Sequence, residues 1–327
     1  MSYQSRVVEF RHVTVTESVY RRTLVHQNPI PEGHPIIVNA KIAGAPISWG
    51  VCEVPGWGHQ MSQSRVLSEM TELGFSACEF GPLGFLPVDA AGRVTTLREH
   101  GLSAVGGFVP VLLHDESHDP TPEIRAELEV FRAAGAEVIV LAASSGSDGY
   151  DARPVLTDAQ WNTLFRHLTE LEALAAEFGV LAVIHPHVGT MVETKDDIER
   201  VLAGSSIGFC LDTGHMFIGG TDPVEFARDH ADRVKHVHAK DVNLAIARRV
   251  KAGELTYYDG VIAGMYVPLG QGDVDVASIV RSLEASGFAG WYVLEQDNVV
   301  TSEPADDGGP AVDARISVDY LRSLLGE

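Results

Sequence analysis

Eight short apolar runs, separated by segments with helical periodicity, organise the chain from about residue 42 onward. In order they read IAGAPIS, SACEF, LSAVGGFVP, EVIVLAA, GVLAVIH, IGFCL, VKHVHA and GWYVLE. Such runs are typical of strands buried on both faces, as in a parallel sheet with helical crossovers. Eight of these units over roughly 285 residues predict an α/β fold, a (β/α)8 TIM barrel. The alternative is an open doubly wound sheet, but no GxGxxG follows the first strand.

The first 40 residues differ from the rest of the chain. RVVEFRHVTVTESVYRRTLVH is locally basic and alternates well enough for one or two strands, and the proline-containing stretch NPIPEGHP ends it. We therefore expect residues 1–40 to form an N-terminal extension and residues 41–327 to form the barrel. The extension is interpreted as an arm over the barrel, an oligomer contact or, in part, an artificial addition.

The excess of acidic residues argues against nucleic acid and anionic membranes as partners. The chain has 45 acidic and 24 basic residues, a formal charge of −21, which repels nucleic acid and anionic membranes. It has three cysteines and no CxxC pair, which fits a reducing cytoplasm. No signal peptide is recognisable, and no apolar stretch reaches the ~18 residues of a membrane span. These features predict a cytoplasmic protein that binds neither nucleic acid nor membrane.

Polar side chains gather at the carboxyl ends of the predicted strands, where α/β barrels carry their active sites. The first strand ends in Trp49 and the second in Glu79. The fifth ends in His185 and His187, and the sixth ends in Asp212 and His215. The seventh ends in His236, His238 and Lys240, and the eighth ends in Glu295. Imidazoles and carboxylates that converge on one point predict a site for a divalent metal of the Mn, Co, Fe or Zn kind. Period-2 spacing places His185 and His187 on one face of their extended segment, so only one of them need bind the ion.

The motifs LDTGH, HVHAKDV, HPHVGTMVET, GAPISWGVCEVPGWG and AGMYVPLGQGDVD resemble those of the xylose-isomerase-like barrel superfamily of sugar isomerases and epimerases. The resemblance covers about residues 41–327 and is strongest to the inosose dehydratase branch. It implies one divalent metal, commonly manganese or cobalt, with magnesium, iron or zinc as alternatives. It also implies that Asp212, His238 and Glu295 are metal ligands. Relatives carry a glutamate at the end of the fifth strand where this chain has HPH. We slightly favour His187 as the fourth ligand and His185 as the base, and the reverse assignment stays open.

The resemblance implies a metal-dependent lyase that dehydrates a keto-inositol (inosose), by removing the proton next to the carbonyl and expelling a β-hydroxyl. The alternatives are a ketose 3-epimerase or sugar isomerase, a keto-sugar or C-glycoside lyase, and a non-catalytic sugar-binding barrel. The predicted catalytic residues are His185, His215, Lys240 and Glu79, and the predicted substrate contacts are Trp49, His236, Glu193 and Arg248. The expected partners are a small polyol or keto-sugar and a second copy of the chain. The long insertion after the seventh strand is interpreted either as a lid or as a surface excursion.

Overall fold

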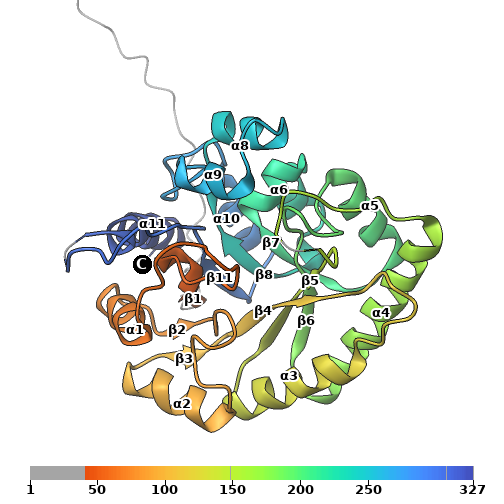
Figure 1. Ribbon diagram of the computed structural model, residues 1–327, viewed down its shortest axis with the longest axis horizontal. Helices are drawn as coiled ribbons and strands as arrows, with labels where there is room; N and C mark the ends of the chain where they lie inside the picture. Colours follow the sequence, from red (N-terminus) through yellow and green to blue (C-terminus); the bar gives the residue numbers. More distant parts are fainter. Residues whose placement is uncertain (1–40, 148, 307, 327) are drawn as a thin grey trace, which may run out of the picture. The chain divides into compact units, whose positions relative to one another are not determined.

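The parallel strands close into a barrel surrounded by helices (Figure 1), in a computed structural model that describes residues 41–147, 149–306 and 308–326. Nine strand segments pair in the order β3-β2-β1-β11-β8-β7-β6-β5-β4. Their bounds are β1 Lys41–Gly44, β2 Ala77–Cys78, β3 Ser103–Ala104, β4 Gly106–Val111, β5 Val138–Ala143, β6 Leu181–Ile184, β7 Gly208–Asp212, β8 Val234–Ala239 and β11 Trp291–Leu294. The predictions for residues 1–40 lie outside the described residues.

The two ends of that order, β3 and β4, are halves of one strand interrupted at Val105. The Val105 amide donates to the Cys78 carbonyl at 3.0 Å on one side, and the Val105 carbonyl accepts from Val138 N at 3.1 Å on the other. The sheet has therefore no free edge, and the nine segments amount to eight strands. The predicted (β/α)8 barrel is confirmed.

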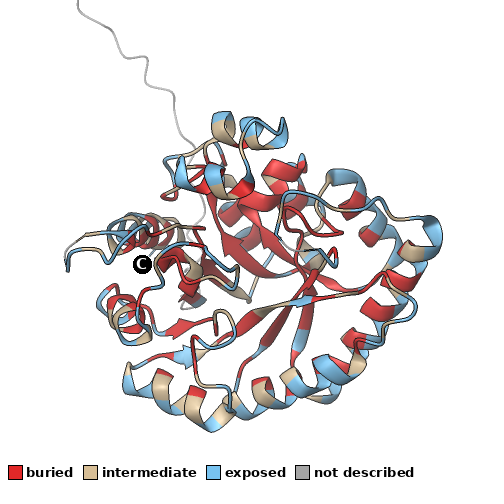
Figure 2. Cartoon of the chain, in the orientation of Figure 1, coloured by how far each residue is buried: buried red, intermediate tan, exposed pale blue. Residues whose placement is uncertain are grey.

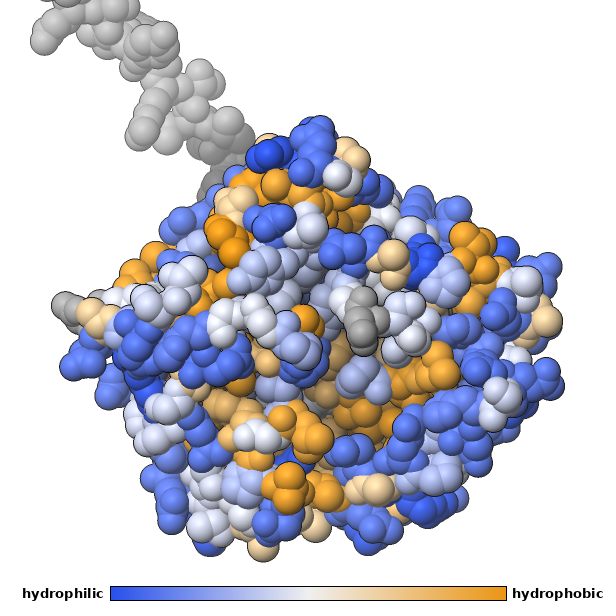
Figure 3. Space-filling view, viewed as in Figure 1, coloured by the Kyte–Doolittle hydropathy of each residue, from blue (hydrophilic) through white to orange (hydrophobic). Residues whose placement is uncertain are grey.

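Helices cover the outside of the barrel (Figure 1). They are α1 Gln63–Glu72, α2 Ala90–Glu99, α3 Thr121–Ala134, α4 Asp158–Glu177, α5 Lys195–Gly204, α7 Pro223–Asp229, α10 Val276–Ala285 and α11 Pro310–Leu325. Capping boxes mark the points where two of these helices begin. Thr157 and Gln160 form the one at the start of α4, and Thr194 and Asp197 form the one at the start of α5. Each helix buries one face against the strands (Figure 2). Hydrophilic residues cover most of the rim formed by α2, α3 and α4 (Figure 3).

The first apolar run is shorter as a strand than the sequence indicates. β1 ends at Gly44, and residues Pro46–Trp49 form a 3-10 helix, η1. Proline has no N–H for a ladder hydrogen bond, and its fixed φ suits the first position of a helix. This turn buries Trp49 completely, and its Nε1 donates to Glu69 Oε2 at 2.7 Å. Trp49 is therefore a core residue rather than a strand-end side chain that faces the site.

The insertion after β8 folds into regular structure that the sequence did not indicate. It comprises β9 Asp241–Val242, α8 Leu244–Lys251, α9 Tyr257–Ile262 and β10 Tyr266–Val267, and a further short helix, α6 Thr213–Gly219, follows β7. The buried Asp241 carboxylate accepts the amides of Gly270 and Gly272 at 2.9 Å each and of Val274 at 3.0 Å. A Cβ at position 272 would lie 2.2 Å from Asp241 Oδ1, so this approach requires glycine. One carboxylate thus fastens the far end of the insertion to the end of β8.

Of the helices in the described part of the chain, none combines the length and the apolar character needed to cross a membrane. The cytoplasmic location and the homo-oligomer remain predictions of the sequence.

Candidate metal and substrate site

Asp212 ends β7 and at the same time caps the N-terminus of α6. Its Oδ1 accepts from Gly214 N at 2.9 Å and from His215 N at 2.7 Å. A carboxylate in this position satisfies two free amides of the helix and is favoured by the helix dipole. One oxygen is thereby fixed, and Oδ2 is left to face the ends of the neighbouring strands.

Three side chains from consecutive strands of the barrel meet at that oxygen. His238 Nδ1 on β8 lies 3.8 Å from Asp212 Oδ2 and 3.0 Å from Glu295 Oε2, which follows β11. Ligand atoms bound at about 2.0–2.2 Å to one ion are roughly 3–4 Å apart. The two distances from His238 fall in this range, and all three ligand atoms lie within 4.8 Å of one another, which makes the three side chains candidates to share an ion. Among the described residues His238 Nδ1 has no hydrogen-bond partner in spite of this proximity. A buried lone pair without a donor, between two carboxylates, fits a cation.

The rings of His185 and His187 lie close together, with their centroids 5.4 Å apart, but the two side chains have different neighbours. His185 Nε2 lies 3.4 Å from Asp212 Oδ2, and its ring centroid is 4.7 Å from that of His238. The His187 ring instead lies 3.8 Å from His215 and lines the neighbouring cavity. Both histidines follow the end of β6 at Ile184 and precede the turn at Val188 and Gly189, so they stay neighbours and differ in what each contacts. This geometry favours His185 over His187 as the fourth ligand, the reverse of the assignment that the sequence slightly favoured.

His187 is a neutral imidazole, and one of its two ring nitrogens, Nδ1, forms a hydrogen bond with the backbone. Its Nδ1 donates to the Val188 carbonyl at 2.7 Å, which leaves Nε2 as the acceptor. Burial, together with the charges of His185 and Lys240, lowers the pKa of His187 to about 4. A neutral imidazole with a free lone pair beside a cavity is the form that a general base requires.

Lys240 is a buried ammonium group surrounded by carboxylates. Its Nζ lies 2.6 Å from Asp297 Oδ1, 2.9 Å from Glu295 Oε1 and 3.3 Å from Asp212 Oδ2. Burial alone would lower the pKa of Lys240, but these carboxylates outweigh it and hold the pKa well above its usual value. Nζ also donates to His215 Nε2 at 3.0 Å, while burial lowers the pKa of His215 well below its usual value. Lys240 is thus a fixed positive charge beside a neutral His215.

Glu79 accepts hydrogen bonds from two histidines of β8. Its Oε1 accepts from His236 Nε2 at 2.9 Å and from His238 Nε2 at 3.2 Å. Burial acts to raise the pKa of Glu79, but His238 and His236 lower it to about 2. The hydrogen bond to Nε2 fixes the His238 ring so that Nδ1 points to Asp212 and Glu295. A carboxylate in this position orients a metal-binding histidine and makes it more basic.

Replacing Glu79 by Gln is expected to weaken the binding of a divalent metal by roughly tenfold or more, because the partner of His238 loses its charge. Titration calorimetry of the metal into metal-free protein measures this directly. Glu72→Gln, on the exposed side of α1, removes the same charge away from the site and serves as the control. Equal metal affinity for Glu79→Gln and Glu72→Gln would contradict the orienting role.

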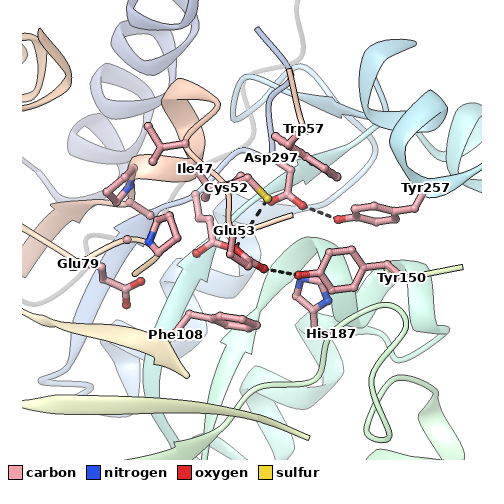
Figure 4. Close-up of a pocket in the computed structure, with 16 residues that line it drawn as sticks. Ile47, Cys52, Glu53, Trp57, Glu79, Phe108, Tyr150, His187, Tyr257 and Asp297 are labelled. Atoms are coloured by element: carbon pink, nitrogen blue, oxygen red, sulfur yellow. Dashed lines mark hydrogen bonds between the residues drawn. The ribbon is translucent and has the colours of Figure 1, made fainter. Parts of the chain in front are cut away.

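A cavity of about 620 Å³, including its open mouth, lies beside this cluster. Its polar lining includes Glu79, His187, Glu295 and Asp297, and its apolar lining includes Pro46, Ile47, Val51, Trp57, Pro82 and Phe108. Figure 4 shows Glu79, Phe108, His187 and Asp297 around this space. The insertion contributes Tyr257, whose hydroxyl donates to Asp297 Oδ2 and lies 2.9 Å from the Tyr266 hydroxyl. The insertion is therefore a wall of the site.

Several predicted substrate contacts lie away from this cavity. Trp49 is in the core, and His236 is buried behind Glu79. Glu193 is paired with Arg153 at 3.2 Å, and Arg248 is exposed on α8. Other lining residues were missed by the sequence argument: Glu53, Phe108 and Tyr150. Phe108 lies within β4, Glu53 lies in the loop after η1 and Tyr150 lies in the loop after β5, so a position directly at a strand end could not have identified them.

Comparison with known proteins extends these observations. A family model described as "Xylose isomerase-like TIM barrel" matches residues 67–324. The rhizopine catabolism protein MocC of Rhizobium meliloti is 34% identical over 276 residues, which cover 82% of this chain and 84% of MocC. The inosose dehydratase of Geobacillus kaustophilus is 31% identical over 303 residues, 87% and 94% of the two chains. A crystal structure of an IolI protein with a bound zinc atom superimposes with a TM-score of 0.64 at 14% identity, over 88% of this chain and 98% of that one.

Proposed function

This chain belongs to the xylose isomerase-like TIM barrel family, and from that premise we propose that it is a metal-dependent lyase that dehydrates a keto-inositol. The observation that carries the proposal is the convergence of Asp212, His238 and Glu295 beside a cavity that a neutral histidine lines. The inosose dehydratase similar to it over most of both chains supports the reaction class. The IolI structure with its zinc atom shares the fold and supports the choice of a metal site.

We assign the metal to Asp212, His238, Glu295 and His185. Two carboxylates and two imidazoles are a donor set suited to a divalent first-row metal, and manganese or cobalt remains the prediction of the sequence. When bound, such an ion supplies a Lewis acid that polarises the substrate carbonyl and acidifies the adjacent C–H. Lys240 balances the remaining carboxylate charge through its contacts with Glu295 and Asp297.

His187 is assigned as the general base. Its Nε2 lone pair accepts the proton from the carbon next to the substrate carbonyl, because Nδ1 is already bonded to the Val188 carbonyl. The imidazolium formed in this way then donates the same proton to the β-hydroxyl. The C–O bond breaks, water leaves, and the electron pair of the former C–H bond becomes the new C=C bond. One histidine on one side of the ring thus accounts for both proton transfers.

Epimerisation or isomerisation is the second candidate, and one feature favours it. Glu79 and His187 lie on opposite sides of the cavity (Figure 4). An epimerase needs two such groups, one to remove the proton next to the carbonyl and one to return it from the other side. Glu79 already accepts hydrogen bonds from two histidines, and its pKa of about 2 keeps it ionised, so it carries no proton to return to the substrate, which places dehydration first.

Mass spectrometry of the products separates the candidate reactions. Metal-loaded protein is incubated with an inosose, a ketose and a 3-keto C-glycoside in D2O. We expect metal-dependent loss of water from the inosose and a product with conjugated carbonyl absorbance. Deuterium uptake without loss of water would indicate epimerisation, and release of the aglycone would indicate the glycoside lyase. No metal-dependent change in any of the three substrates would reject the proposed function.

A further inference from the structure

The loop between η1 and α1, residues 50–61, is fixed against the segment that follows β11. His59 N donates to the Val300 carbonyl at 2.6 Å, and Trp57 Nε1 donates to the Asn298 carbonyl at 2.9 Å. Gly58 has a φ of +105°, and a Cβ there would lie 2.6 Å from Val300 O, so only glycine permits this approach. The loop is therefore a firm support for the side chain of Glu53 at the mouth of the cavity.

Glu53 is joined across the mouth to Tyr150, which lies in the loop after β5. The Tyr150 hydroxyl donates to Glu53 Oε1 at 2.6 Å (Figure 4). The Tyr150 ring packs at a centroid distance of 4.8 Å from His187, the proposed base. Close backbone contact holds it there, because a Cβ on Gly189 would lie 2.6 Å from the Tyr150 backbone. The Cys52 thiol donates to the other carboxylate oxygen of Glu53, Oε2, at 3.7 Å.

Some carboxylates that line the cavity are paired with positively charged or histidine side chains, and one is not so paired in the part of the chain that the structure describes. The cavity lining has four carboxylates, those of Glu53, Glu79, Glu295 and Asp297, and includes no lysine or arginine among the described residues. Glu79 is paired with two histidines, and Lys240 reaches both Glu295 and Asp297. Glu53 forms no ion pair within the described ranges. An exposed carboxylate whose second oxygen has a thiol, a weak donor, as its contact accepts hydroxyl donors and repels an anionic group.

We propose that Glu53 is a specificity-determining residue that binds hydroxyl groups of the substrate ring remote from the metal, and that Tyr150 positions it. The inference rests on the proposed function, because it assumes that a polyol occupies this cavity. It names the substrate class more closely: the ring is polyhydroxylated and uncharged. Rings that carry a phosphate or a carboxylate are rejected at the mouth, before they reach His187.

Calorimetric titration of metal-loaded protein with myo-inositol and with inositol monophosphate tests this without turnover. Glu53→Gln keeps the shape of the side chain and removes the charge. We expect its affinity for myo-inositol to fall by roughly tenfold, as for the loss of a hydrogen bond to a charged group. Its affinity for the monophosphate is expected to rise. Tyr150→Phe is expected to weaken myo-inositol binding to a smaller degree, and Glu129→Gln, on the exposed side of α3, is expected to change neither.

Kinetics with an inosose give a second readout. Glu53→Gln is expected to raise KM roughly tenfold with little change in kcat, since the contact is remote from the reacting carbon. Unchanged affinity of Glu53→Gln for both ligands would overturn the inference, as would the failure of wild-type protein to bind myo-inositol. If the selectivity changes as expected but no inosose is dehydrated, the proposed function fails while the role of Glu53 stands.

Discussion

Asp212→Asn and His238→Ala are each expected to abolish turnover while the barrel stays folded. Each substitution removes a donor from the metal cluster. A Lewis acid at this position stabilises the transition state by several kcal/mol, so we expect its loss to lower kcat/KM by roughly a thousandfold or more. Asparagine remains a good N-cap, so the hydrogen bonds from Gly214 N and His215 N to position 212 can persist. Metal content by mass spectrometry, activity and the thermal melting curve are measured on the same preparation.

A matched control for Asp212→Asn exists in the chain. Asp222 caps α7 in the same way, with its Oδ1 2.8 Å from Val224 N, but it is exposed. Asp222→Asn is expected to keep wild-type metal content and turnover. Wild-type activity in Asp212→Asn or His238→Ala after exhaustive chelation would show that the proposed reaction does not depend on this metal site.

His187→Gln and His185→Gln are expected to fail in different ways. Loss of the base at position 187 should lower kcat by roughly a hundredfold to ten-thousandfold and leave the affinity for the metal unchanged. Loss of the donor at position 185 should lower metal affinity, and activity should recover in part at high metal concentration. The difference follows from the two positions, since His185 lies 3.4 Å from Asp212 whereas His187 lies beside His215.

Metal affinity and single-turnover rates separate these two effects. If His187→Gln loses the metal and His185→Gln keeps it, the two roles are exchanged and the assignment favoured by the sequence is correct. If both variants keep the metal and full turnover, neither histidine has the proposed role.

The sequence was most informative where structure depends on local periodicity. The eight apolar runs predicted the barrel, and the capping box of Thr157 and Gln160 marks the start of α4 at Asp158. The gathering of polar side chains at the strand ends was also predictable, because the fold brings the ends of consecutive strands together. The choice of Asp212, His238 and Glu295 among them came from the family resemblance. The sequence was least informative for the insertion, since its short elements depend on Asp241 contacts made about thirty residues along the chain.

The sequence by itself determined the barrel, the edge of it that carries the chemistry and the side chains that meet there in acid–imidazole clusters. Only the tertiary structure placed His185 beside Asp212 and His187 beside His215, buried Trp49 in the core, and brought Glu53 to Tyr150 across 97 positions of sequence. The physical reason is that strand periodicity fixes side-chain direction only while the chain stays extended. Beyond the last paired residue, direction depends on turns and on contacts between loops, which no local pattern records.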